Sequence, residues 1–133
     1  MPWTFEIVTG KMFNPAGTFV SAGYSGGNKG RNPEGVDNPA DEGIPNVGPL
    51  PEGLYTFGTP VDHSQLGPFA IPLIPDPAND MRGRGNFFCH GDSTSLDHSA
   101  SEGCIIQPRP TREAMWNSDD RSIQVVANLP VSN

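Results

Sequence analysis

Basic residues are scarce in this sequence. Eight lysines and arginines stand against fifteen aspartates and glutamates, so the formal net charge is -7 at pH 7. A nucleic-acid-binding protein needs a positively charged surface for the phosphates, and no cluster of basic residues supplies one here. We therefore expect no nucleic-acid partner.

Long apolar runs are also missing. No stretch approaches the roughly 20 consecutive apolar residues that a membrane-spanning helix needs. Met1-Pro2-Trp3 leads directly into a strand-like pattern, without the basic and apolar regions of a signal peptide. We expect a protein that spans no membrane and is made in the cytoplasm without a signal peptide. Action outside the cytoplasm would then require a secretion machine.

Cysteine is rare as well, with one residue at Cys89 and one at Cys104. A zinc site could draw on these two with His90 and His98. Neighbouring residues on a strand face apart, however, and there is no Cys-x-x-Cys spacing, so zinc is disfavoured and we expect no metal and no cofactor. A disulfide between Cys89 and Cys104 stays open as an alternative.

Glycine and proline, by contrast, are abundant: 16 glycines and 15 prolines in 133 residues, of which 35% are hydrophobic. This composition predicts a loop-rich, mainly β domain. The length suits a single domain, and we expect one catalytic domain over residues 1–133, with a core over 1–127 and a C-terminal tail over 128–133. We expect it to be a monomer.

Strands are predicted where apolar and polar residues alternate. Residues 3–8 and 11–13, followed by 18–24, predict a β-meander at the N-terminus. Pro68 and Pro72 cannot donate to a ladder, so the extended segment 67–74 is expected at a sheet edge or on the surface. Further strands are expected at 54–57, 87–90 and 122–126, and a short helix at 111–116 with Thr111 as its N-cap.

The chemistry is concentrated in 87–92 and 101–106. The apolar run of the first stretch ends at His90-Gly91, and Cys104 follows fourteen residues later in a Ser-x-Gly-Cys turn. A thiol with an imidazole in reach is a nucleophile with its base. Strand alternation places Cys89 on the face opposite His90, so we expect Cys89 to be buried and inert. Gly103 leaves room for a substrate carbonyl beside backbone amides that suit an oxyanion.

These two stretches resemble a known signature. His90-Gly91-Asp92 and Ser101-Glu102-Gly103-Cys104-Ile105 resemble the His-Gly and Ser-His-Gly-Cys motifs of the L,D-transpeptidase catalytic domain. The longer strings 90–93 and 99–106 look closer to the small L,D-transpeptidase-like effectors of type VI secretion, as do 23–26 and 48–55. The resemblance spans roughly residues 1–127 and implies a β-sandwich-like catalytic domain.

The resemblance also implies roles for individual residues. Cys104 would attack a peptide carbonyl in a peptidoglycan stem, and His90 would take the thiol proton and later serve the leaving amine. Water would complete an L,D-carboxypeptidase reaction, and a D-amino acid would complete an L,D-transpeptidase exchange. Ser101 would support the catalytic pair. Supporting or substrate-binding positions would be Gly91, Asp92, Ser93, Gly103 and Arg109.

Two positions depart from the usual transpeptidase pattern. Glu102 stands where that family has histidine, and Ile106 stands where it often has a basic residue. A substrate carboxylate would therefore need another partner, and Arg109 and Arg112 are the nearest candidates. The effector branch shares the first departure, which favours an effector over a housekeeping cross-linking enzyme.

An effector implies secretion machinery, action in the periplasm of a target bacterium and a cognate immunity protein. The acidic chain suggests that such an inhibitor presents basic residues. Two other functions remain alternatives. Another cell-wall cysteine amidase or peptidase would use the same residue types, although these enzymes usually place cysteine before histidine in the chain. A non-catalytic wall-binding module would need neither the cysteine nor the histidine for its function.

Overall fold

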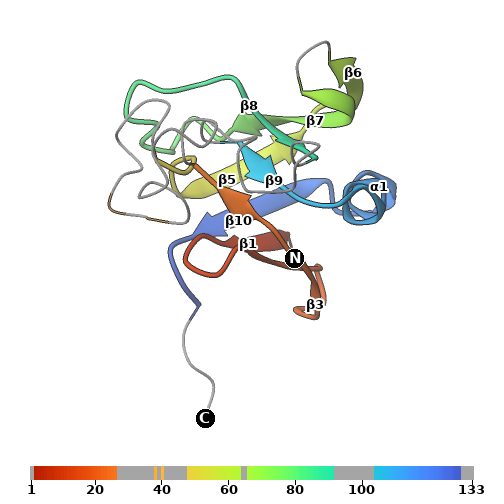
Figure 1. Cartoon of the computed structure of the whole chain (residues 1–133). Helices are drawn as coiled ribbons and strands as arrows, with labels where there is room; N and C mark the ends of the chain where they lie inside the picture. The colour runs from red at the N-terminus through yellow and green to blue at the C-terminus, as the bar shows by residue number, and fades with distance from the viewer. Residues whose placement is uncertain are drawn as a thin grey trace.

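The computed structural model describes residues 2–26, 38, 40, 48–63, 66–91 and 104–129. In this part the prediction of a mainly β chain with one short helix near the C-terminus is confirmed (Figure 1). The elements in chain order are β1 (Trp3–Glu6), β2 (Lys11–Phe13), β3 (Phe19–Ala22), β4 (Tyr24–Ser25), β5 (Gly53–Phe57), β6 (Val61–His63), β7 (Gly67–Pro75), β8 (Phe87–His90), β9 (Ile105–Ile106), α1 (Arg109–Asn117) and β10 (Ser122–Val126).

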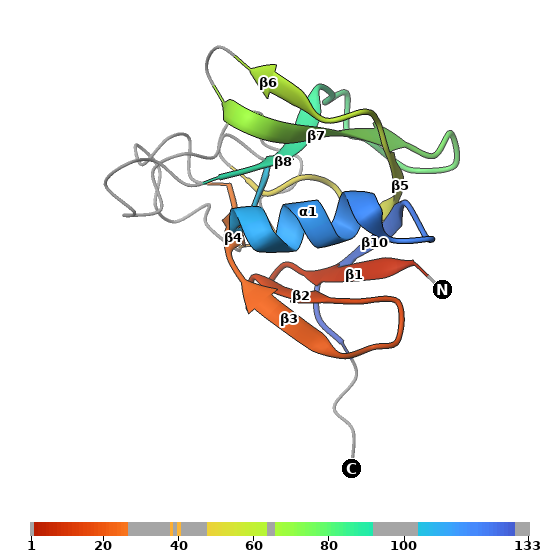
Figure 2. The same cartoon turned by 90° about the vertical axis from the view of Figure 1, so that its right-hand side faces the viewer.

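The strands form one mixed sheet that curls almost into a barrel. Its order is β3-β2-β1-β10-β5-β7-β8-β9-β4, with β6 paired to β7. The pairs β1/β10 and β8/β9 are parallel, and the other pairs are antiparallel. β3 and β4 are consecutive in the chain yet lie at opposite ends of the path, so the sheet nearly closes on itself (Figure 2). The expected two-layer sandwich is therefore replaced by one bent sheet.

Two glycines allow the ends of this sheet to approach. The Gly23 amide, between β3 and β4, donates to the Gly10 carbonyl at 2.7 Å. A Cβ atom on Gly23 would lie 1.6 Å from the Ile106 carbonyl oxygen, and one on Gly10 would lie 1.9 Å from the Gly23 oxygen. No side chain fits at either position, and Gly10 also has a φ of +71° that favours glycine.

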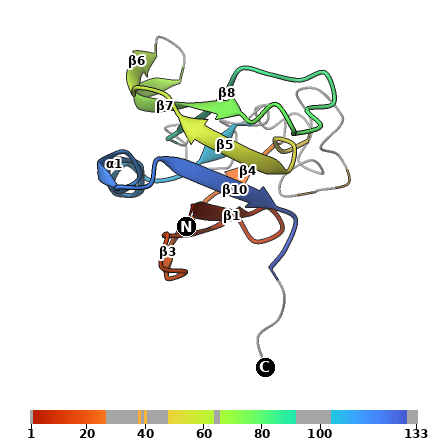
Figure 3. The same cartoon turned by 180° about the vertical axis from the view of Figure 1, so that it is seen from behind.

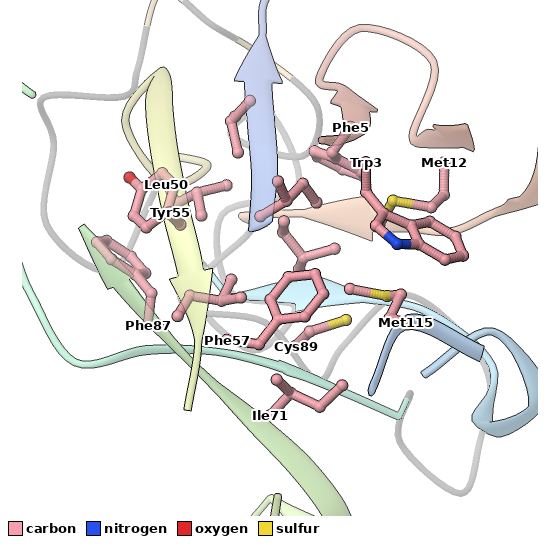
Figure 4. Packing of buried hydrophobic residues seen from close by; sticks show 14 of the residues in the cluster. Trp3, Phe5, Met12, Leu50, Tyr55, Phe57, Ile71, Phe87, Cys89 and Met115 are labelled. Atoms are coloured by element: carbon pink, nitrogen blue, oxygen red, sulfur yellow. The ribbon is translucent and has the colours of Figure 1, made fainter. Parts of the chain in front are cut away.

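The interior of the curled sheet holds the hydrophobic core (Figure 4). Alternate residues of the strands point inward, as Ile123 and Val125 do on β10, and both are fully buried. The Tyr55 ring is buried in this core, and its hydroxyl donates to the Pro51 carbonyl at 2.6 Å. Met115 anchors α1 to this core.

The N-terminal meander and the last strand are confirmed. β1, β2 and β3 pair antiparallel in order, and β10 lies between β1 and β5 (Figure 3). The chain after β10 remains bonded to the sheet, because the Leu129 amide donates to Glu6 Oε2 at 2.6 Å.

The predicted edge position of the 67–74 segment is wrong. This segment is β7, which lies between β5 and β8. On one side its partner changes from β6, up to Ala70, to β5, from Leu73 onward. Pro72 stands in that changeover and points its carbonyl to the same side, where the Gly58 amide donates to it at 2.8 Å. The missing proline N–H therefore falls at a gap in the ladder.

The predicted start of the helix is also wrong. α1 begins at Arg109, with Pro108 as the N-cap residue, and Thr111 lies buried inside the first turn. Pro110 lies in the first turn of the helix, where proline is suited because its fixed φ is helical and no N–H is required. The Thr111 hydroxyl instead lies 2.7 Å from that of Ser21 and joins α1 to β3.

Candidate active site

His90 ends β8 with its side chain 98% buried, since only 2% of the residue is exposed. Its Nδ1 lies 2.8 Å from the Gly91 carbonyl oxygen. A carbonyl only accepts hydrogen bonds, so in the neutral ring Nδ1 carries the proton and Nε2 presents a lone pair. His90 is thereby held in the tautomer that can take a proton at Nε2.

Cys104 stands immediately before β9. β8 and β9 are parallel, and Ile105 is the register partner of Cys89. Cys104 therefore lies beside Phe88, whose amide donates to Cys104 Sγ at 3.3 Å. A hydrogen bond to sulfur favours the thiolate over the thiol. The sulfur is half-buried and belongs to no disulfide.

The register brings the predicted pair together. Phe88 and His90 share one face of β8, because side chains alternate along a strand. Cys104 lies beside Phe88, so it is one strand across and two residues along from His90. Strand spacings put the two Cα atoms roughly 8 Å apart, a separation that a thiol and an imidazole can bridge.

Cys89 has the opposite environment. It is fully buried and points into the core among Phe57, Ile71 and Met115 (Figure 4). Burial raises the pKa of the Cys89 thiol to about 12. The expectation of a buried Cys89 is confirmed, and a thiol with this pKa is a poor nucleophile. No disulfide joins it to Cys104.

The two candidate arginines lie on the first turn of α1 in different environments. Arg109 is 50% exposed, pairs with Glu113 at 3.4 Å and lies over the ring of Phe69. Arg112 is only 5% exposed and donates to backbone carbonyls, including that of Gln107 at 3.0 Å. Burial lowers the pKa of its guanidinium.

A buried polar network supports the histidine from the other end of β9. The Gln107 amide donates to the His90 carbonyl at 3.0 Å. The Gln107 side chain donates from Nε2 to the Gly10 carbonyl at 3.1 Å and accepts from the Ser21 hydroxyl at 2.6 Å. The backbone of His90 is therefore tied to the point at which the sheet closes.

A family model described as the Tlde1 domain matches residues 20–129. The chain belongs to the Tlde1 domain family. Its members are type VI secretion effectors with an L,D-transpeptidase-like domain, so the resemblance noted in the sequence is confirmed. Searches of curated proteins and of solved structures each gave no significant match.

Several predicted site residues of this Tlde1 domain lie outside the described residues. They are Asp92, Ser93, Ser101 and Gly103, together with His98 of the zinc alternative. Within the described ranges, no three His, Cys, Asp or Glu side chains gather as a group that could hold a metal ion. No helix in these ranges is both long and apolar enough to cross a membrane.

Two structural features around Phe88 were not predicted from the sequence. One is the Phe88 amide, which has no side-chain signature and is placed by the β8/β9 register. The other is the position of His63. This residue is half-buried on β6, accepts from the Leu66 amide at 3.1 Å and packs edge-on against the Phe88 ring, with the centroids 5.4 Å apart. Only the β6/β7 pairing brings it there.

Proposed function

We propose that this Tlde1 domain is a cysteine enzyme that acts on peptidoglycan stem peptides as an L,D-carboxypeptidase, an L,D-transpeptidase, or both. The supporting observation is the β8/β9 register, which puts Cys104 one strand across and two residues along from His90, with the imidazole tautomer set by Gly91 and the sulfur accepting the Phe88 amide. Family membership supports the same reaction class.

The proposed reaction starts with His90 Nε2 taking the Cys104 thiol proton. The sulfur attacks the carbonyl carbon that precedes the terminal D-amino acid, and the carbonyl electrons move onto oxygen. Backbone amides near Cys104, including the Gly103–Cys104 region, would stabilise that oxyanion. When the intermediate collapses, the C–N bond breaks and imidazolium returns its proton to the leaving amine. A thioester to Cys104 remains.

The second half of the reaction decides the product. Water attacks the thioester to release a shortened stem, which is carboxypeptidase activity. The amine of a D-amino acid attacks it to form a new peptide bond, which is exchange. In either case His90 takes a proton from the nucleophile and the thiol of Cys104 is regenerated. We propose that Ser101, Asp92, Ser93, Gly91 and Arg109 support this chemistry by orienting the imidazole or the substrate.

The direct test is mass analysis of muropeptides after incubation with the purified protein. We expect loss or exchange of the terminal D-amino acid with the native protein and none with Cys104→Ala or His90→Ala. Cys89→Ala is the matched control and should retain turnover. Cleavage at a different bond would identify another amidase or peptidase, and no change in the muropeptides would support a binding module. Either result contradicts the proposal.

We further propose that the protein is an antibacterial effector delivered to the periplasm of a target bacterium and restrained by an immunity protein. Membership of an effector family supports this. The net charge of -7 favours an inhibitor with a basic surface, because complementary charge speeds association.

Expression in a Gram-negative host tests the site of action. Toxicity should appear only when a periplasmic signal is added and only with Cys104 intact. Equal toxicity from the cytoplasm, or from Cys104→Ala, would contradict the effector proposal.

A further inference from the structure

Arg112 is a buried cation without a carboxylate partner among the described residues. It is 95% buried, whereas its neighbour on α1, Arg109, pairs with Glu113. Its Nε donates to the Gln107 carbonyl, and its Nη1 donates to those of Pro68 and Phe69 at 2.9 and 2.8 Å. Arginine is almost never this buried unless an anion compensates its charge.

The remaining nitrogen of this guanidinium lies beside Gly91. A Cβ atom on Gly91 would stand 3.1 Å from Arg112 Nη2 and 3.7 Å from Cζ. Nη2 makes no hydrogen bond to the described residues, whereas Nε and Nη1 are committed to carbonyls. Glycine at position 91 therefore leaves open the side of the guanidinium that carries an unused donor.

This donor adjoins the residue that holds the base. Gly91 directly follows His90, and its carbonyl fixes the His90 tautomer. In the proposed reaction His90 protonates the leaving amine of a terminal D-amino acid. The carboxylate of that amino acid is two bonds from its nitrogen, so it must lie close to His90 when the amine leaves. A guanidinium is well suited to carboxylate because its N–H donors match the spacing of the oxygens.

We propose that Arg112 Nη2, against which residue 91 places no side chain, binds the α-carboxylate of the terminal D-amino acid. This inference rests on the proposed function and narrows its substrate to stems that end in an unblocked carboxylate. Arg112 is then a specificity-determining residue. Arg109 is less suited to the task, because Glu113 already neutralises part of its charge and half of the residue is exposed to water.

The substrate itself provides the first test. A tetrapeptide stem with a terminal D-alanine carboxylate is compared with the same peptide ending in a carboxamide. Binding of each to the Cys104→Ala protein is measured by calorimetry or by NMR titration, so that turnover plays no part. A charge-assisted hydrogen bond should make the carboxylate peptide bind roughly 10- to 100-fold more tightly. Equal binding of the two peptides would overturn the inference.

Variants of Arg112 provide the second test. In the Cys104→Ala background, Arg112→Met should bind both peptides equally weakly, and Arg112→Lys should restore part of the preference because it keeps the charge. Arg121→Met is the matched control, since Arg121 lies over Trp116 at the other end of α1 and should keep full discrimination. Thermal unfolding of each variant checks the fold, and the two-peptide comparison on the unaltered Arg112 stands even where a variant fails to fold.

The inference and the proposed function fail in different assays. Absence of turnover by the native protein contradicts the proposed function. Equal binding of the carboxylate and carboxamide peptides to the Cys104→Ala protein contradicts the role of Arg112. A preference that survives in Arg112→Met would assign carboxylate recognition to another cation, and it too would overturn the inference.

Discussion

The two thiols should differ in reactivity by at least three orders of magnitude, and this difference tests the geometry of the site. The perturbation is alkylation with iodoacetamide at pH 8 under native conditions. Cys89 has a pKa of about 12, so only about 1 in 10,000 molecules holds it as the thiolate at pH 8. An unperturbed thiol, with a pKa near 8.5, is about one-quarter thiolate at the same pH.

The ratio of thiolate populations is therefore roughly 2,000, before accessibility is considered. Cys89 is also fully buried, so the reagent reaches it only when the fold opens. Cys104 is half-buried and accepts the Phe88 amide, which should keep its reactivity at or above that of an ordinary thiol. Raising the pH to 10 increases the Cys89 thiolate about 100-fold, yet only to about 1%.

Intact-mass time courses measure this difference. The native protein and Cys89→Ala should each gain one label quickly, and Cys104→Ala should remain unlabelled over the same period. In guanidinium chloride both thiols should label at similar rates, which shows that the fold causes the difference. Native-state labelling of Cys104→Ala at more than about 1% of the native rate would refute the assignment of Cys89 to the core and of Cys104 to the active face.

Three further predictions concern stability. Gly23→Ala should lower the free energy of unfolding by about 3 kcal/mol or more, because its Cβ would overlap the backbone at the closure of the sheet; Gly85→Ala, which meets no atom within 4 Å, should change it little. Gln107→Leu should cost about 1–3 kcal/mol in urea unfolding, because it removes two buried hydrogen bonds. Hydrogen bonds from the Leu129 amide and then from the Thr9 hydroxyl hold the pKa of Glu6 below its usual 4.5. The ionised carboxylate therefore stabilises the fold above pH 4.5, and this stabilisation is lost as the pH falls through the lowered pKa. Glu6→Gln should therefore be less stable than the native protein near neutrality, with the difference closing below about pH 4 in thermal melts.

Each of these has an outcome that would contradict it. Equal unfolding midpoints for the two glycine variants would mean that the sheet closes without the contact at Gly23. A neutral Gln107→Leu substitution would show that Ser21 and Gly10 find other partners. A stability difference for Glu6→Gln that is constant from pH 3 to 7 would separate the carboxylate from the Leu129 hydrogen bond.

Local patterns in the sequence were sufficient to predict the positions of most individual strands. The apolar run located β8 and alternation located β10, both with their observed ends, and alternation over 3–8 and 11–13 located the first hairpin. These predictions succeed because side-chain alternation and turn chemistry act between residues close in the chain. The opposite facing of Cys89 and His90 was also predictable, since side chains alternate along a strand without reference to any other element. The catalytic pairing of His90 with Cys104 stays a prediction.

Long-range packing decided the features that were predicted wrongly. Proline at position 72 indicated an edge strand, but the change of partner from β6 to β5 opens a gap in an interior ladder. Threonine is a common N-cap residue, yet the Thr111 hydroxyl forms a hydrogen bond with the hydroxyl of Ser21, ninety residues earlier, in a buried network. Neither partner is visible from the local sequence, because each is brought near only when the sheet curls.

The sequence by itself determined the mainly β class and the buried position of Cys89, because each follows from residue type and short-range periodicity, and it predicted the pairing of His90 with Cys104. The tertiary structure alone decided that the sheet nearly closes at Gly23, that the Phe88 amide reaches the sulfur, and that Arg112 rather than Arg109 is the buried cation beside Gly91. The physical reason is that burial, desolvation and hydrogen bonding depend on which segments meet in space. Two arginines three residues apart on one helix therefore have the same sequence signal and opposite environments.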